Sequence, residues 1–151
     1  MKLTREWLQK KGACADGIKY WEAIGSPDAG ETMTRAAADG EYGYCRWLIA
    51  KCMDKPAAVD LAILSAEMAL PIFEKKYPED KRPRAAIEAA KAWRSDPSDE
   101  NEAKARSAAD AAAAAAAYAA ADATADAADA ADAARKETWT KMAAKFCELT
   151  K

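Results

Sequence analysis

The chain has 151 residues, of which 23 are basic and 25 acidic, so its net charge is only −2. This length fits one domain with a core of its own, and the balanced charge gives no global signal for binding nucleic acid or an anionic membrane. The chain contains no histidine, which excludes the Ser-His-Asp triad, cysteine–histidine catalysis and histidine-containing zinc sites.

Glycine and proline divide residues 1–97 into short predicted helices. The hydroxyl of Thr4 can cap a first helix, which ends at Gly12, and Asp16 can cap a second helix, which ends at Gly25. Both helices carry aromatic and aliphatic residues at helical spacing, so we expect them to pack against a core.

Two further short helices follow the predicted loop GSPDAG. Glu31 or Thr32 opens the third, which ends near Gly40. The fourth covers about residues 42–53 and gathers its apolar residues on one side, which is typical of an amphipathic helix.

A longer helix is predicted to begin around Pro56, which suits a first helical turn. It continues through AAVDLAILSAEMALPIFEKKY, and Pro71 should kink or split it near Met68. The charged connector YPEDKRP leads to another helix, which begins at Pro83 and carries RAAIEAAKAW.

Residues 98–151 contain no glycine or proline and are mostly alanine, the best helix former. Ser98 can cap this helical tail. One unbroken helix of about 50 residues would be about 75 Å long, whereas a domain of this size has a radius of gyration of about 15 Å. We therefore favour a bend or hairpin around residues 119–126 over a projecting helix that pairs with another chain. Apolar residues near the end form a core stripe of Trp139, Met142, Phe146 and Leu149.

No strand pattern is present, so the predicted class is all-α: a multi-helix bundle with a long alanine-rich C-terminal helix or helical hairpin. We expect one all-helical domain over residues 1–151, with a short-helix half (1–97) and an alanine-rich half (98–151).

The four cysteines, which include no CxxC pair, predict reduced and mostly buried thiols in a cytoplasmic protein. The N-terminus lacks the apolar run of a signal peptide. The longest apolar run of the tail, at residues 111–121, is shorter than the roughly 18 residues of a membrane span. We expect a soluble protein without a membrane partner.

A compact charged cluster surrounds the YPEDKRP connector and has three readings. Asp80 or Glu74 could pair with Arg82 or Arg84 and lock the corner between two helices. The same cluster could be a partner-binding patch, or it could contact phosphate or nucleic acid. Its members are Glu74, Lys75, Lys76, Glu79, Asp80, Lys81, Arg82 and Arg84.

Residues 98–134 carry eight acidic and only two basic residues. An acidic face within this part could simply be solvated, could wrap over a curved partner, or could mimic the phosphates of a nucleic acid. The face consists of Asp122, Asp126, Asp129 and Asp132. The five tryptophans are expected mainly in the core, although one or two could be exposed interface anchors.

The segment ALPIFEKKYPEDKRPRAAIEAAKAW and the alanine-rich region after it resemble the Imm-5-type putative immunity proteins of bacteria and their phage-encoded relatives. The opening TREWLQKKGACADG resembles that of phage-borne members. The resemblance implies an all-helical protein that neutralises a toxin. Residues that match the strongest motif are Leu70, Pro71, Phe73, Glu74, Lys76, Pro78, Asp80, Arg82, Pro83, Arg84, Ile87, Glu88, Ala90 and Trp93.

Together these features predict a non-enzymatic inhibitor that acts by binding another protein, with no catalytic residue, cofactor or metal. The partner is a toxin in the first reading. In the alternative reading, the chain is a phage or mobile-element anti-defence protein, for example of the anti-CRISPR type, which binds a host defence component. No direct contact with nucleic acid is expected, and the alanine-rich helix could also form a homodimer. The candidate partner-binding residues are Phe73, Glu74, Lys76, Asp80, Arg82, Arg84, Glu88 and Trp93.

Overall fold

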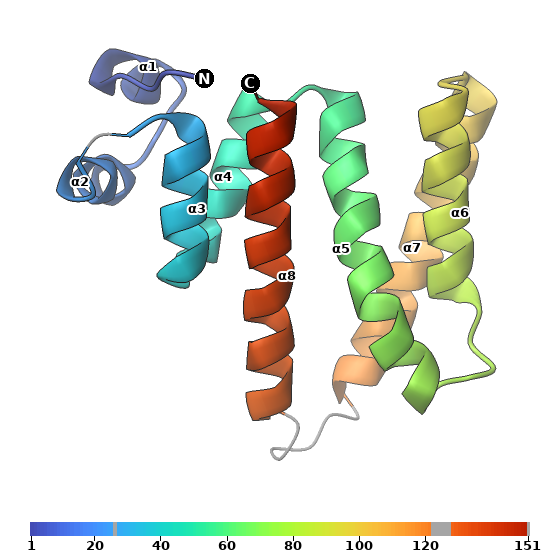
Figure 1. Ribbon diagram of the computed structural model, residues 1–151. Coiled ribbons are helices and arrows are strands. Elements are labelled where there is room, and N and C mark those ends of the chain that lie inside the picture. Colours follow the sequence, from blue (N-terminus) through green and yellow to red (C-terminus); the bar gives the residue numbers. More distant parts are fainter. Residues whose placement is uncertain (26, 122–127, 151) are drawn as a thin grey trace. The chain divides into compact units, whose positions relative to one another are not determined.

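The fold was analysed in a computed structural model, which describes residues 1–25, 27–121 and 128–150, with side chains described outside 114–132. Within these ranges the chain forms eight helices and no strand, which confirms the predicted all-α class (Figure 1). The helices are α1 (Arg5–Lys10), α2 (Ala15–Ala23), α3 (Ala29–Ala38), α4 (Tyr42–Cys52), α5 (Lys55–Lys76), α6 (Arg82–Ser95), α7 (Asp99–Ala121) and α8 (Ala128–Leu149).

The helices form two compact units. Unit 1 comprises Met1–Ala58 and Ala133–Lys151, and unit 2 comprises Val59–Asp132. Unit 1 therefore holds α1–α4 with most of α8, whereas unit 2 holds α6 and α7 with most of α5. The prediction of one domain over the whole chain stays a prediction.

The first helix begins and ends where the sequence predicts. Thr4 caps α1, because its hydroxyl oxygen accepts a hydrogen bond from the backbone N–H of Trp7 at 3.1 Å. Gly12 follows the helix with φ +79°, a conformation that favours glycine, and Gly25 and Gly40 follow α2 and α3 in the same way.

The predicted start of α2 was wrong. Cys14, rather than Asp16, is the N-cap, and its sulfur accepts a hydrogen bond from the N–H of Gly17 at 3.3 Å. Asp16 lies inside the first turn, where its negative charge interacts favourably with the helix dipole. Sulfur is a weak acceptor, so a sequence rule based on oxygen caps does not point to this residue.

The third helix also starts earlier than predicted. Asp28 caps α3, with its carboxylate accepting from the N–H of Glu31 at 2.9 Å, so the helix begins within the predicted GSPDAG loop and not at Glu31 or Thr32. The N–H of Ala29 donates to the carbonyl of Met1 at 2.9 Å. This contact with a distant part of the chain helps to fix the start of the helix.

The core of unit 1 lies where α3, α4 and α8 run beside one another (Figure 1). Met33, Cys45 and Phe146 come from these three helices and have no exposed surface. Trp139 of α8 stacks on Tyr42 of α4 with ring centroids 5.3 Å apart. The predicted C-terminal stripe is thus largely confirmed: Met142 and Phe146 are buried, Trp139 is half-buried and Leu149 is 36% exposed.

The tryptophans are placed mainly as predicted. Trp21 and Trp93 are buried, and the other three are half-buried. Trp7 and Trp47 meet edge to face with ring centroids 6.0 Å apart. None of the five is exposed, which favours packing roles.

Pro71 does not split α5, which continues as one helix to Lys76. Among the described residues α5 is also the one helix with the length and apolar composition of a membrane span. A single such helix is weak evidence for a membrane span, and α5 is not a buried core helix, since Leu61 is its one buried residue. The predicted bend of the tail, at residues 119–126, falls mostly on 122–127, which lie outside the described residues; α7 ends before them and α8 begins after them.

The four cysteines are all free, but only Cys45 is buried, so the prediction of mostly buried thiols was too strong. Cys14 is exposed, and Cys52 and Cys147 are half-buried. Burial raises the pKa of the Cys45 and Cys52 thiols to about 11.

Replacing Asp28 by alanine should lower the free energy of unfolding by about 1 kcal/mol, because the substitution leaves the N–H of Glu31 without its cap. Asp16→Ala is the matched control, and we expect an effect of less than about half of that. Urea unfolding of both variants measures the difference. Equal losses would contradict the placement of the cap at Asp28.

At pH 8 a disulfide reagent should modify Cys14 at least about tenfold faster than Cys45, because the thiolate of a buried cysteine is scarce and shielded. Cys14→Ser should abolish the fast phase and keep a side-chain cap on α2. A fast phase that survives this substitution would show that another thiol is accessible.

Candidate partner-binding groove

The corner between α5 and α6 is locked by two arginine–carboxylate pairs. Arg84 donates to both carboxylate oxygens of Glu74, at 2.8 and 2.6 Å. Arg82 donates to Asp80 through its Nε and Nη atoms, at 2.6 to 3.2 Å. This geometry confirms the corner lock that the sequence suggested for these four residues.

The Glu74–Arg84 pair is the last of three ion pairs that join α5 to α6. Asp60 pairs with Arg94 at 2.8 Å, and Glu67 pairs with Lys91 at 2.9 Å. We call these three pairs the α5–α6 ladder. Its acids are seven residues apart along α5 and therefore share one face of the helix. The Glu74–Arg84 pair was among the predicted pairs. The Glu67–Lys91 and Asp60–Arg94 pairs join residues too distant in sequence to be predicted.

The ladder shifts the ionisation of its members. Hydrogen bonds from the Arg84 guanidinium lower the pKa of the Glu74 carboxyl, and Glu74 raises the pKa of Arg84 in return. Hydrogen bonds to Glu67 and Glu88 raise the pKa of Lys91. The cations of the ladder are thus already engaged within unit 2.

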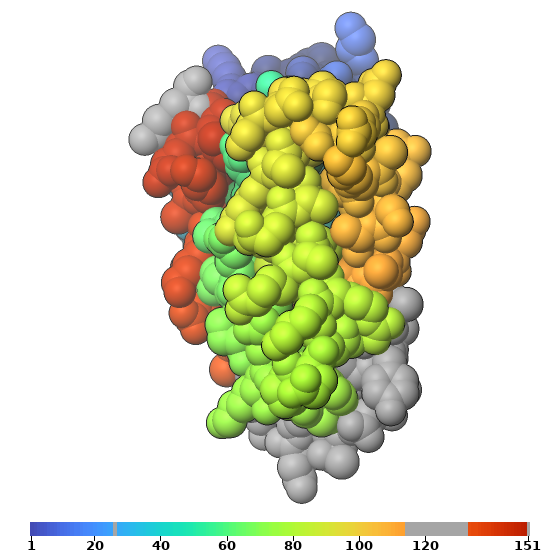
Figure 2. Space-filling model, turned by 90° about the vertical axis from the view of Figure 1, so that its right-hand side faces the viewer, coloured from blue at the N-terminus to red at the C-terminus, as the bar shows by residue number. Residues whose placement is uncertain are grey.

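Beside the ladder lies an apolar groove with a volume of about 430 Å³. Its walls come from α5 and α7, and from α6, whose Ile87 is only 5% exposed. Figure 2 shows α6 across one face of unit 2 with α7 next to it. The lining residues are Ala62, Ile63, Ala66, Ala69, Leu70, Phe73, Pro83, Ala86, Ile87, Ala90, Ala109, Ala112 and Ala113.

Alanine contributes eight of these thirteen residues, so the groove exists because small side chains leave space between three helices. The sequence analysis treated the alanines as helix formers and did not find the groove. The available signal was the spacing of Ala62, Ala66, Ala69 and Phe73, which places all four on one face of α5.

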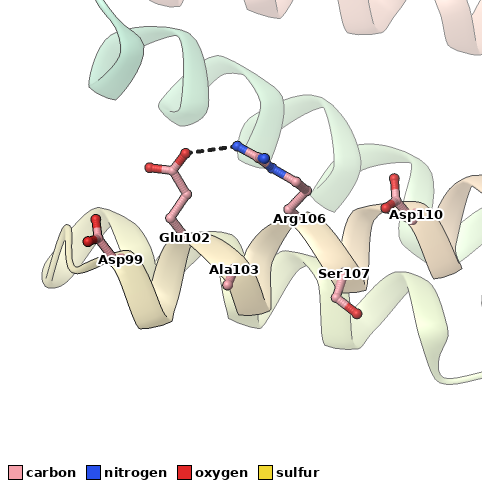
Figure 3. A pocket seen from close by; sticks show the side chains of 6 residues that line it. All are labelled: Asp99, Glu102, Ala103, Arg106, Ser107 and Asp110. Carbon is pink, nitrogen blue, oxygen red and sulfur yellow. Dashed lines mark hydrogen bonds and ion pairs between the residues drawn. The ribbon is translucent and has the colours of Figure 1, made fainter.

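A second, polar recess of about 540 Å³ lies on α7 (Figure 3). All six lining residues come from this one helix, so the recess is an open surface and not a cleft. Arg106 pairs with Glu102 at 3.1 Å. Glu102, Arg106 and Asp110 project from the same side of α7, whereas Ser107 projects from the other side (Figure 3).

The predicted partner-binding residues occupy three different settings. Phe73 lines the groove and contacts the ring of Tyr77, with centroids 5.0 Å apart. Trp93 is buried, at 6% exposed, and packs inside unit 2. The remaining six are charged and surround the corner and the ladder: Glu74, Lys76, Asp80, Arg82, Arg84 and Glu88.

The predicted acidic face lies outside the described side chains. This applies to all four of its members, Asp122, Asp126, Asp129 and Asp132. Where side chains are described, no group of three or more Cys, Asp or Glu residues is arranged to hold a metal ion.

We expect the Glu74–Arg84 pair of the ladder to make the free energy of unfolding depend on pH, and we expect Glu74→Gln to remove this contribution. A carboxyl whose pKa is lowered on folding contributes stability above its unfolded pKa, near 4.5, and loses it as the pH falls through the folded pKa. The difference in unfolding free energy between wild type and Glu74→Gln should therefore be largest at pH 6 and shrink at pH 3. Urea unfolding at both pH values tests this.

Glu79→Gln is the matched control for that experiment, because Glu79 is an exposed glutamate of the connector. Its difference from wild type should change little between the two pH values. A control that follows the same pH profile as Glu74→Gln would contradict a specific role of the ladder.

In a comparison with protein-family models, residues 50–139 match the family described as "Imm-5 like putative immunity protein". No curated protein and no solved structure matches the chain. The matched region is more than half of the chain, and it contains all of unit 2 with its ladder and groove. The chain therefore belongs to the Imm-5 like putative immunity protein family.

Proposed function

We propose that the protein is a non-enzymatic inhibitor that binds a toxin protein in the cytoplasm and keeps it inactive. Membership of an immunity-protein family implies that the chain acts by binding another protein. The toxin, the inhibition and the location are our proposal.

The main support for the proposal is that the region matched by the family contains the whole groove. Residues 50–139 cover every lining residue of the groove and all members of the α5–α6 ladder, but leave out α1, α2 and α3. What this chain shares with its family is therefore the part that offers an apolar recess, and we place the toxin contact there. An apolar recess bordered by polar residues is typical of a protein contact.

Binding without catalysis is favoured by the chemistry of the same region. The chain has no histidine, the usual general base. The carboxylates of the ladder are engaged with arginine and lysine, and the pKa of Glu74 is lowered, whereas a general acid at neutral pH needs a raised one.

The test is neutralisation of the proteins encoded by the neighbouring genes. Each is expressed in a laboratory bacterium with and without this chain, and growth is measured. We expect one neighbour to arrest growth, the chain to restore it, and the two purified proteins to form a complex. A toxic neighbour that the chain neither binds nor neutralises would contradict the proposal.

The double variant Ala69→Gln/Ala109→Gln tests whether the toxin binds in the groove. It adds an amide side chain to two walls of the groove at positions whose exposure leaves room for it, and glutamine is a good helix former. We expect toxin binding to weaken about tenfold or more, which is about 1.4 kcal/mol.

Ala85→Gln/Ala111→Gln is the matched control, since both alanines are exposed, lie on α6 and α7, and do not line the groove. It should bind the toxin within about twofold of wild type. Circular dichroism and thermal unfolding of both double variants verify that they fold. Equal binding by the two would exclude the groove as the contact.

The anti-defence function remains a second candidate because residues 98–134 are strongly acidic, and Asp99 and Asp110 of α7 are exposed. An acidic helix of this kind could compete with nucleic acid for a host defence complex. The test replaces the predicted acidic face by asparagine in a phage-protection assay. Inhibition that survives this change would remove the acidic face from the candidate: Asp122, Asp126, Asp129 and Asp132.

A further inference from the structure

The groove has the length of a short helix. Its lining residues on α5 extend from Ala62 to Phe73, which is about 16 Å along the helix axis, or about three helical turns. Its volume of about 430 Å³ is within the range of sites that enclose a ligand. The site is thus long enough for a secondary-structure element of a partner.

The lining chemistry selects an apolar occupant. All thirteen lining side chains are alanine, isoleucine, leucine, phenylalanine or proline, and none can donate or accept a hydrogen bond. A polar small molecule would lose its hydration here without compensation. A helix avoids this cost, because its backbone groups are hydrogen-bonded internally and only its apolar side chains enter the groove.

The alanine walls favour a helix for a second reason. Ala109, Ala112 and Ala113 on α7 and Ala62, Ala66 and Ala69 on α5 allow another backbone to approach closely. Ile72, which is 61% exposed, lies three residues after Ala69 and so is its neighbour on the surface of α5. It extends the apolar surface beyond the groove.

The charges that border the α7 wall of the groove are predominantly negative. Asp110 adjoins Ala109 and lies three residues before Ala113, so it borders the α7 wall. Asp110 also lines the polar recess of α7, which contains three carboxylates and one guanidinium. That guanidinium, of Arg106, pairs with Glu102 (Figure 3). Within the described part of the chain, neither Asp99 nor Asp110 has an ion pair.

The cations of the ladder and the arginine of the α7 recess are already paired with carboxylates. Arg84, Lys91 and Arg94 are engaged in the α5–α6 ladder, and Arg106 is engaged with Glu102. A fatty acid carboxylate at the α7 wall would meet Asp110, and the guanidinium of Arg106 there is already paired with Glu102. The charge complementarity calls for a basic occupant.

From these observations we infer that the groove receives an amphipathic α-helix of the partner protein, whose apolar ridge fills the groove and whose Lys or Arg residues face the acidic side of α7. This inference rests on the proposed function for the identity of the partner as a toxin. It adds the chemistry of the segment that the toxin contributes.

The probes are two synthetic 14-residue helical peptides labelled with fluorescein. Both carry leucine at i, i+3, i+4 and i+7 spacing; one has lysine at three positions along one flank, and the other has glutamate at the same positions. Fluorescence anisotropy is recorded against the full-length protein at 50 mM salt. We expect the lysine peptide to bind with a Kd of about 10–100 μM and the glutamate peptide at least about tenfold more weakly.

Two substitutions assign the charge effect. Asp110→Lys should weaken the lysine peptide about fivefold or more and strengthen the glutamate peptide. Asp16→Lys changes the net charge equally but touches no residue of the groove or of its α7 border, so it should change the ratio of the two affinities much less than Asp110→Lys does. Ala69→Gln/Ala109→Gln should weaken the lysine peptide about tenfold, and Ala85→Gln/Ala111→Gln should not.

Three results would overturn the inference: equal binding of the two peptides, binding that the groove variants do not weaken, or a homodimer in sedimentation that Ala69→Gln/Ala109→Gln dissociates. The third would mean that a second copy covers the groove. If the peptides fail while neutralisation still depends on the groove, the inference is wrong and the proposed function stands. If the lysine peptide binds as expected but no neighbouring protein is neutralised, the inference stands and the proposed function is wrong.

Discussion

The ion pairs between α5 and α6 are the constraint on which the groove depends. α5 is an apolar helix with an internal proline, and its three acids at seven-residue spacing pair with bases of α6. These contacts hold one flank of α5 against α6, while the alanines of its adjoining face leave space toward α7. Ion pairs on one flank of α5 and small side chains on the adjoining face thus border the apolar recess of this helical unit.

The two units also differ in how their helices are packed. Unit 1 has conventional packing, with fully buried Met33, Cys45 and Phe146 from three helices. Unit 2 has few buried side chains among its described residues, and it relies more on alanine contacts and ion pairs. A surface that is meant for a partner does not bury its own apolar residues, so the looser packing agrees with a binding role for the part of the chain that the family shares.

The sequence predicted local features well and distant contacts poorly. Gly12, Gly25 and Gly40 placed helix ends correctly, because positive φ is a property of a single residue. The lock at Glu74 and Arg84 was within reach because the two are ten residues apart. The start of α3 was missed although its cap, Asp28 on the N–H of Glu31, is local, and the Asp60–Arg94 pair was missed because 34 residues separate its members. The groove needs knowledge of which faces of three helices meet, and no single segment contains that information.

The alanine walls also bear on how such a protein changes over generations. Alanine is already the smallest residue that a helix accommodates without the cost of glycine. Almost any replacement at Ala66, Ala90 or Ala112 therefore narrows the recess and leaves the helix intact. Under the proposed function, single-codon changes of side-chain volume would alter which partner the recess accepts while the backbone stays the same.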